Sequence, residues 1–216
     1  MKKYDVIAFD LDGTLTNPER GLVAGFQYAF DKLGIEYERL ESLKRFIGPP
    51  LFDEWRCCFG LSDEECNEAL RVFREFYDVY GWRENEIYPG VHKMLSSLKA
   101  SGKKLVIATS KPERVANKVL GLFDLKKYFD FISTATIDKK RDKKCEVLEY
   151  ALKSIGSPEK SKCIMIGDRV YDAEGAHLVG IDSMGVFYGH GSREEIMNSR
   201  FTLFAENVYE IMRIIT

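Results

Sequence analysis

Short apolar runs without clean alternation recur along the chain and constrain its fold more than any other feature. The five runs, each bounded by turn residues, cover residues 4–9, 104–110, 129–134, 162–168 and 182–188. Val, Ile, Phe and Met in unbroken succession over so few residues are typical of strands buried on both faces. Helical patterns lie between the runs, over residues 92–102, 111–123 and 143–156. This alternation predicts an α/β fold, a Rossmann-like parallel sheet with helices on both faces.

One segment interrupts this alternation. From about residue 18 to residue 86 no strand-like run occurs, and helical patterns fill the sequence instead. The phenylalanines that recur there at helical spacing, and are expected to form a core, are Phe26, Phe30, Phe73 and Phe76. A chain of 216 residues is long enough for one domain with a smaller one inserted. We therefore predict an α/β core over residues 1–17 and 87–216 and an inserted helical domain over residues 18–86.

The composition limits which binding partners and which cellular compartment can be expected. The formal net charge is −2, so bulk electrostatics give no indication of a nucleic-acid or membrane partner. Five cysteines without a CxxC pair indicate thiols in a reducing compartment, not a disulfide framework or a zinc site. The N-terminus is too polar for a signal peptide, and no segment approaches ~18 apolar residues. We expect a cytoplasmic protein without nucleic-acid or membrane partners, and the sequence leaves monomer and homodimer open.

Two aspartates stand at the end of the first apolar run, in a place that buried strands usually keep free of carboxylates. Asp10 and Asp12 are two residues apart, so in an extended chain they point to the same side, ~6.6 Å apart at Cα. Gly13 permits a sharp turn after them, and Thr14 offers a hydroxyl and a backbone N–H to an anion. A calcium-binding loop would need glycine and glutamate where leucine and glycine stand. A paired-carboxylate site is the remaining interpretation.

Reactive side chains also follow other apolar runs. They are Thr109, Ser110 and Lys111 after the second run, Asp168 and Asp172 after the fourth, and Lys143 and Lys144 where the helix over 143–156 begins. The carboxyl ends of parallel strands meet at one edge of a sheet, where ligands bind in open α/β folds, so we expect these groups to converge. Like charges ~4 Å apart repel by several kcal/mol at an effective dielectric of ~20. Four carboxylates therefore imply a divalent cation, and all-oxygen ligands suit Mg²⁺.

The ordered set of motifs resembles one known family. DLDGT, an apolar strand ending in threonine, a downstream lysine and GDRVYD follow one another between residues 10 and 172. This order is similar to that of the haloacid dehalogenase superfamily of phosphohydrolases. FIGPPL at 46–51 and FYGHGSREE at 187–195 resemble its phosphoglycolate-phosphatase-like branch, which carries a helical (C1-type) cap where this chain has its helical insertion.

The resemblance implies catalytic roles for four residues. Asp10 matches the family's nucleophile, and an aspartate carboxylate is ionised at neutral pH without an activating base. Asp12 matches the general acid/base, which protonates the leaving alcohol and later deprotonates the attacking water. Thr109 matches the hydroxyl that holds a phosphoryl oxygen, with Ser110 as the alternative. The lysine that neutralises charge on the transferring group best matches Lys144.

The resemblance also implies a Mg²⁺ site and substrate contacts. Lys143 is the alternative for the active-site lysine. The metal ligands would be Asp10, the backbone carbonyl of Asp12, Asp168 and, through a bound water or by steadying Lys144, Asp172. The residues assigned to substrate binding are Gly13, Thr14, Ser110 and Lys111 in the core, with Arg45 and Gly48 in a loop of the inserted domain. His190, in the loop after the fifth run, is a further candidate for substrate contact.

The activity that follows from the resemblance is Mg²⁺-dependent hydrolysis of a small phosphomonoester through an aspartyl-phosphate. Phosphoglycolate, a nucleoside monophosphate and a sugar phosphate are the substrates left open. A dehalogenase of the superfamily lacks the second aspartate, so Asp12 argues against that activity. A sugar-phosphate mutase carries a histidine early in its cap, whereas the first histidine here is His92. A receiver-type phospho-aspartate signalling domain, the alternative from another class, has no helical insertion of this length.

Overall fold

The computed structural model of the protein describes residues 4–136 and 140–215. The chain divides into two compact units. The first unit comprises Met1–Asn17 and Ile87–Thr216, and the second unit comprises Pro18–Glu86. Where the chain passes between them, the short strands β2 (Thr16–Asn17) and β3 (Glu86–Ile87) pair in a two-stranded sheet.

The first unit is built on a six-stranded sheet whose neighbouring strands are all parallel, in the order β5-β4-β1-β6-β7-β8. The strands are β1 (Val6–Phe9), β4 (Lys104–Pro112), β5 (Phe131–Ala135), β6 (Cys163–Gly167), β7 (Asp182–Val186) and β8 (Leu203–Ala205). The central strand β1 lies between β4 and β6, and Phe9 is in register with both Ile107 and Ile166. The predicted α/β fold is therefore confirmed. The edge strand β8 escaped prediction because it is only three residues long.

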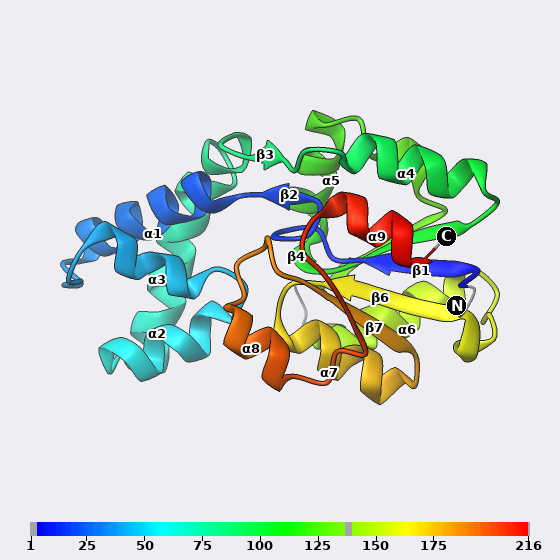
Figure 1. The fold of residues 1–216 in the computed structure, drawn as a ribbon. Helices are drawn as coiled ribbons and strands as arrows, with labels where there is room; N and C mark the ends of the chain where they lie inside the picture. The colour runs from blue at the N-terminus through cyan, green and yellow to red at the C-terminus, as the bar shows by residue number, and fades with distance from the viewer. Residues whose placement is uncertain (1–3, 137–139, 216) are drawn as a thin grey trace. The chain divides into compact units, whose positions relative to one another are not determined.

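Helices cover both faces of this sheet. Figure 1 shows α4 and α9 on the side of the sheet opposite to α6 and α7. The α-helices of the first unit are α4 (Val91–Ala100), α5 (Glu113–Leu122), α6 (Lys144–Ser154), α7 (Val170–Val179), α8 (Arg193–Asn198) and α9 (Val208–Ile215). Its 3₁₀ turns are η3 (Lys126–Tyr128) and η4 (Lys160–Lys162).

Burial on both faces explains the unbroken apolar runs. Val6 and Ala8 of β1 pack in one cluster with α6 and α7, while the intervening Ile7 and Phe9 are also fully buried. Neither face of a central strand can therefore take polar residues without leaving them unsatisfied. The ionisable residues of β1, β4 and β6 and of the segments that follow them lie at or beyond the strand ends, and the candidate site lies beyond the carboxyl ends.

The second unit is helical in its described structure. It contains α1 (Glu19–Leu33), the 3₁₀ helix η1 (Leu40–Phe46), α2 (Leu51–Phe59), α3 (Asp63–Tyr77) and the 3₁₀ turn η2 (Gly81–Arg83). Its core is aromatic: the fully buried Trp55 ring packs edge-on against Phe26, Phe30 and Phe73, with ring centroids 5.8, 5.0 and 6.2 Å away. Phe76, also expected in this core, is only half-buried and stacks on Tyr28.

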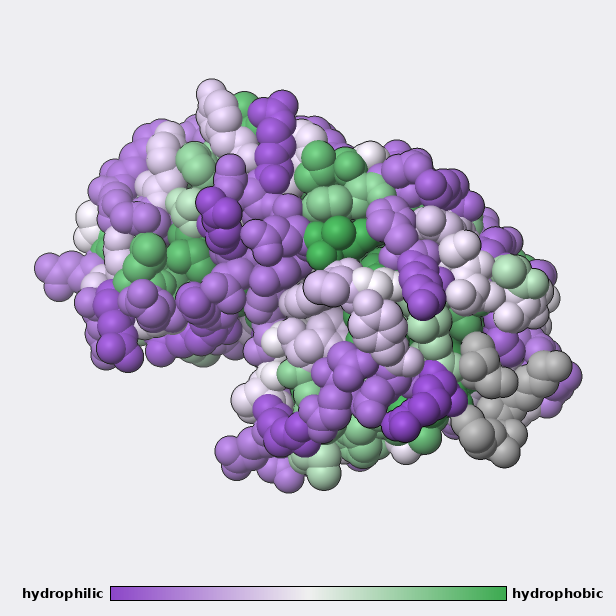
Figure 2. All heavy atoms as spheres, turned by 45° about the horizontal axis from the view of Figure 1, so that its top comes forward, coloured by the Kyte–Doolittle hydropathy of each residue, from purple (hydrophilic) through white to green (hydrophobic). Residues whose placement is uncertain are grey.

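Hydrophilic residues cover much of the face drawn in Figure 2. Most of the large apolar side chains are instead in the interior of the first or the second unit. Among the described residues, each helix is too short or too polar to cross a lipid bilayer.

The aromatic core of the second unit gives a stability prediction. We expect Trp55→Ala to lower the free energy of unfolding by about 3–5 kcal/mol, because it removes the residue on which three other rings pack. Urea denaturation followed by circular dichroism measures the change. Val79→Ala is the control, since Val79 is about half exposed and should change the midpoint little. A Trp55→Ala variant as stable as the wild type would contradict this account of the core.

Candidate active site

The candidate site begins where β1 ends. The backbone N–H of Asp10 still donates to the Ile166 carbonyl at 2.9 Å, as a residue of the sheet would. The chain then turns: Gly13 has φ +80°, and the Leu15 N–H donates back to the Leu11 carbonyl at 2.9 Å. Asp12 lies directly before this turn, in an isolated β-bridge with Thr16, so the pairing of β1 within the sheet has ended when the chain reaches it.

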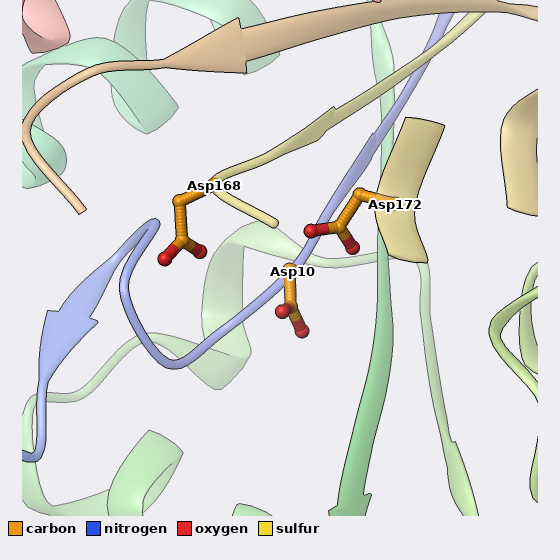
Figure 3. A group of neighbouring side chains, drawn as sticks. All are labelled: Asp10, Asp168 and Asp172. Carbon is orange, nitrogen blue, oxygen red and sulfur yellow. The ribbon is translucent and has the colours of Figure 1, made fainter. Parts of the chain in front are cut away.

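Three carboxylates from separate parts of the chain gather at this edge of the sheet. Asp10 follows β1, Asp168 follows β6, and Asp172 lies in the first turn of α7. One carboxylate oxygen from each lies within 4.8 Å of those of the other two. Figure 3 shows the three side chains beside one another. Asp168 and Asp172 are almost fully buried. The parallel topology brings these acids together as the sequence predicted, since all three stand beyond carboxyl ends of neighbouring strands.

Burial makes this cluster costly to charge. Desolvation, with Asp172 and Asp10 nearby, raises the pKa of Asp168 to about 8. Desolvation also raises the pKa of Asp172, although the Lys144 ammonium acts in the opposite direction. Both shifts have the same physical cause, because a buried carboxylate loses its hydration and faces other negative charges. A cation bound at this point would relieve both effects.

Lys144 is the cation that the structure places in the cluster. Its Nζ lies 3.0 Å from Asp10 Oδ1 and 2.8 Å from Asp172 Oδ1, and it donates to the Ala108 carbonyl at 3.1 Å. Burial acts to lower the pKa of Lys144, but Asp10 and Asp172 outweigh it and hold that pKa above its ordinary value. Lys143, the alternative left open by the sequence, is exposed.

Asp12 has a different cationic partner. Its Oδ2 accepts a hydrogen bond of 2.5 Å from the ammonium of Lys111, whose side chain is only 5% exposed. Its Oδ1 is buried and, among the described residues, accepts no hydrogen bond. The sequence assigned Lys111 to the substrate, and the structure gives it the second aspartate as a partner.

The hydroxyls near the cluster serve two different groups. Thr14 Oγ1 donates to Asp168 Oδ1 at 3.0 Å, so the anion that this hydroxyl contacts is a carboxylate of the protein itself. Thr109 is buried, and its Oγ1 accepts from the backbone N–H of Lys111 at 3.2 Å. Its neighbour Ser110 is exposed.

The predicted substrate residues of the inserted segment, Arg45 and Gly48, are exposed in the second unit. Arg45 lies over the Phe46 ring, with its guanidinium carbon 4.8 Å from the ring centroid. Their role in binding substrate stays a prediction.

Sequence reasoning missed the loop that holds Asp168 in place. The His190 backbone N–H donates to Asp168 Oδ2 at 2.9 Å, which is a contact through the main chain and not through the imidazole. A Cβ built on either Gly189 or Gly191 would overlap Asp168, so the loop backbone approaches it more closely than any side chain would permit. The GHG sequence after the fifth apolar run was the available signal.

The residues present fit a divalent cation. Among the described residues, four carboxylates face two lysines, an excess of two formal negative charges; the acids are Asp10, Asp12, Asp168 and Asp172. Their ligand atoms are all oxygens, and three of them are close enough to share one ion. This donor set suits Mg²⁺, a hard cation that takes few protein carboxylates and keeps some of its waters.

Comparisons with known proteins agree with this geometry. Residues 7–186 match the family described as haloacid dehalogenase-like hydrolase. The 5′-nucleotidase of Pseudomonas aeruginosa is 34% identical over 213 residues, covering 99% of this chain and 96% of that protein. Tyrosine-protein kinase PtkA of Mycobacterium tuberculosis is 34% identical over 198 residues, covering 92% of this chain and 67% of that protein. The crystal structure of a predicted phosphatase from Clostridium acetobutylicum has a TM-score of 0.93 at 38% identity, covering 99% of this chain and 98% of the other.

The crowding at Gly13 gives a prediction for the metal site. A Cβ there would overlap the carboxylate of Asp168, so we expect Gly13→Ala to displace that carboxylate and weaken Mg²⁺ binding at least about 10-fold. Titration calorimetry with MgCl₂ measures the change.

Gly102→Ala is the matched control. Gly102 has φ +76°, close to that of Gly13, but no atom lies within 4 Å of a Cβ built there. Both variants should lose the ~1–2 kcal/mol that a left-handed backbone costs an L-residue, and only Gly13→Ala should lose metal affinity. Equal losses of Mg²⁺ affinity in the two variants would show that backbone strain, and not contact with Asp168, is responsible.

Proposed function

The chain belongs to the haloacid dehalogenase-like hydrolase family and is a phosphatase, and we propose that it hydrolyses a small phosphomonoester in a Mg²⁺-dependent reaction through an aspartyl-phosphate. One observation supports this most directly. Lys144 lies between Asp10 and Asp172, with Asp168 beside them, so the proposed nucleophile, a cation and the proposed metal ligands lie at one sheet edge. Phosphoryl transfer depends mainly on such positioning and charge neutralisation.

In the proposed reaction, the carboxylate of Asp10 attacks the phosphorus of the substrate. A bond forms between an Asp10 oxygen and phosphorus, while the bond from phosphorus to the leaving alcohol oxygen breaks. Lys144 keeps the nucleophile oriented and offsets negative charge as the phosphoryl group moves. Mg²⁺, held by Asp10, Asp168 and Asp172, would add further charge neutralisation.

Asp12 would exchange protons with the two oxygens that flank the phosphoryl group. It gives a proton to the leaving alcohol in the first step and takes one from the water that hydrolyses the aspartyl-phosphate in the second. Lys111 holds Oδ2 of Asp12, which leaves the buried Oδ1 as the atom for this transfer. The hydroxyl of Thr109, beside the backbone of Lys111, would donate to a phosphoryl oxygen.

The second unit would act as a cap that excludes water and binds the leaving group, and so contributes to substrate specificity. Its position in the chain, between β2 and β3, and its helical content support this role. Arg45 and Gly48 would then contribute to substrate contact.

Similarity to the 34% identical 5′-nucleotidase makes a nucleoside monophosphate our first choice of substrate class, with phosphoglycolate and sugar phosphates as the alternatives. A panel of metabolite phosphates compared by kcat/KM distinguishes them.

The role of Asp10 is tested with p-nitrophenyl phosphate. We expect the wild type to hydrolyse it with Mg²⁺ and to lose the activity in EDTA, and Asp10→Asn to lose about 10⁴-fold or more in kcat, because an amide is a poor nucleophile. Asp142→Asn, at an exposed acid, should keep full activity. Substantial turnover by Asp10→Asn, folded as judged by circular dichroism, would rule out this nucleophile.

Asp12 should fail at a different step. p-Nitrophenolate is a good leaving group and needs little protonation, so Asp12→Asn should still form the aspartyl-phosphate but hydrolyse it slowly, by about 10²–10⁴-fold. Stopped-flow absorbance should then show a burst of one nitrophenolate per active site, followed by slow turnover. Asp10→Asn should show no burst. If Asp12→Asn also lacks the burst, Asp12 is needed for formation of the aspartyl-phosphate itself, and the proposed role in proton transfer alone is wrong.

A further inference from the structure

The side chain of Glu195 does not bind the backbone N–H of Ser192, the partner that the local sequence predicts, but binds residues 169–170 instead. The sequence SREE at 192–195 has the spacing of a capping box, in which the glutamate accepts from the backbone N–H of the serine. Only half of the box forms: Ser192 Oγ accepts from the Glu195 N–H at 3.0 Å. The Glu195 carboxylate instead reaches 25 residues back, where Oε1 accepts from the Val170 N–H at 3.0 Å and from Arg169 Nε at 2.8 Å.

The second unit contains the same motif in its ordinary form. At the start of α3, Glu65 accepts from the Ser62 N–H at 2.8 Å while Ser62 Oγ accepts from the Glu65 N–H at 3.2 Å. The two motifs have the same serine-to-glutamate spacing and the same helix position. The difference therefore lies in the surroundings of Glu195. Residues 169–170 offer its carboxylate two donors, one of them a charged guanidinium, in place of the single N–H of Ser192.

That segment is the one between two of the clustered acids. Arg169 and Val170 stand between Asp168 and Asp172, and the Arg169 N–H in turn donates to Asp172 Oδ2 at 3.1 Å. The Arg169 and Glu195 side chains are 16% and 24% exposed, so their ion pair is better shielded than a surface bridge. Glu195 thus fixes the main chain midway between a carboxylate on its N-terminal side and one on its C-terminal side.

We propose that Glu195 is a positioning residue for the metal site: it holds residues 168–172 so that Asp168 and Asp172 present their oxygens to one divalent cation. The inference rests on the proposed Mg²⁺-dependent function. Repulsion between carboxylates acts to separate them when no ion is bound, and a fixed main chain between them opposes such a movement. Outer contacts of this kind typically change metal affinity by about 10–100-fold.

The test compares Mg²⁺ affinity with fold stability in the full chain. Titration calorimetry with MgCl₂ gives the Kd, and thermal denaturation in EDTA gives the stability without metal. We expect Glu195→Ala to raise the Kd for Mg²⁺ about 10–100-fold. Glu195→Gln, which still offers an oxygen to the Val170 N–H, should recover most of that affinity. At saturating Mg²⁺ the kcat for p-nitrophenyl phosphate should approach the wild-type value in both variants.

Glu65→Ala is the matched control, because it removes the same capping position from α3 and should leave the Kd for Mg²⁺ unchanged. An unchanged Kd in Glu195→Ala, or a Glu65→Ala variant that weakens Mg²⁺ binding equally, would overturn the inference. Failure of the proposed function is separate from this, since the wild type itself would then neither bind Mg²⁺ nor release phosphate.

Discussion

The ion pairs of Lys144 with Asp10 and Asp172 are the contacts on which the rest of the site depends. Each of these carboxylates is close to others of the same charge, and unit charges ~4 Å apart interact with ~4 kcal/mol at an effective dielectric of ~20. One ammonium between two acids turns part of that repulsion into attraction. It also receives a third partner, the Ala108 carbonyl of β4, so the lysine is fully engaged in spite of its burial. Removing it would leave buried charges without compensation, which is far more costly than losing a surface pair.

A second constraint is how closely the backbone approaches Asp168. Gly13, Gly189 and Gly191 come from two loops far apart in the sequence, and none of them has room for a Cβ on its Asp168 side. This close approach lets the N–H of His190, between two of these glycines, donate to the buried carboxylate of Asp168. The site is consequently rigid where it holds Asp168, because the packing and the hydrogen bonds specify one position for that carboxylate.

Much of the fold and part of the site could be predicted from local sequence patterns, and the remainder depends on long-range contacts. Unbroken apolar runs predicted the parallel sheet, and strand ends predicted where the acids meet. The choice between two adjacent lysines was also encoded locally: Lys144 shares the helical face of Val147, Leu148 and Ala151, which is the buried face of α6. By contrast, residues 38–46 have a helical pattern that becomes 3₁₀ from Leu40. The partners of Thr14, Lys111 and Glu195 lie 154, 99 and 25 residues away, and no local pattern contains that information.

The two aspartates at the end of β1 show how one residue type can be given two tasks. Asp10 and Asp12 are only two positions apart, yet their carboxylates contact different lysines. Asp10 contacts Lys144 and lies with the buried acids that would bind metal, so its charge is held in place, as the proposed nucleophile requires. Asp12 contacts Lys111 through one oxygen, and its other oxygen accepts no hydrogen bond from the part of the chain that the structure describes, which suits the proposed role of binding and releasing a proton. Two cations supplied by different elements, α6 and β4, therefore differentiate two identical carboxylates. The short spacing suits the proposed nucleophile and the proposed acid, which must flank the same phosphoryl group, and the separate lysines give them the different charge environments that the two proposed roles require.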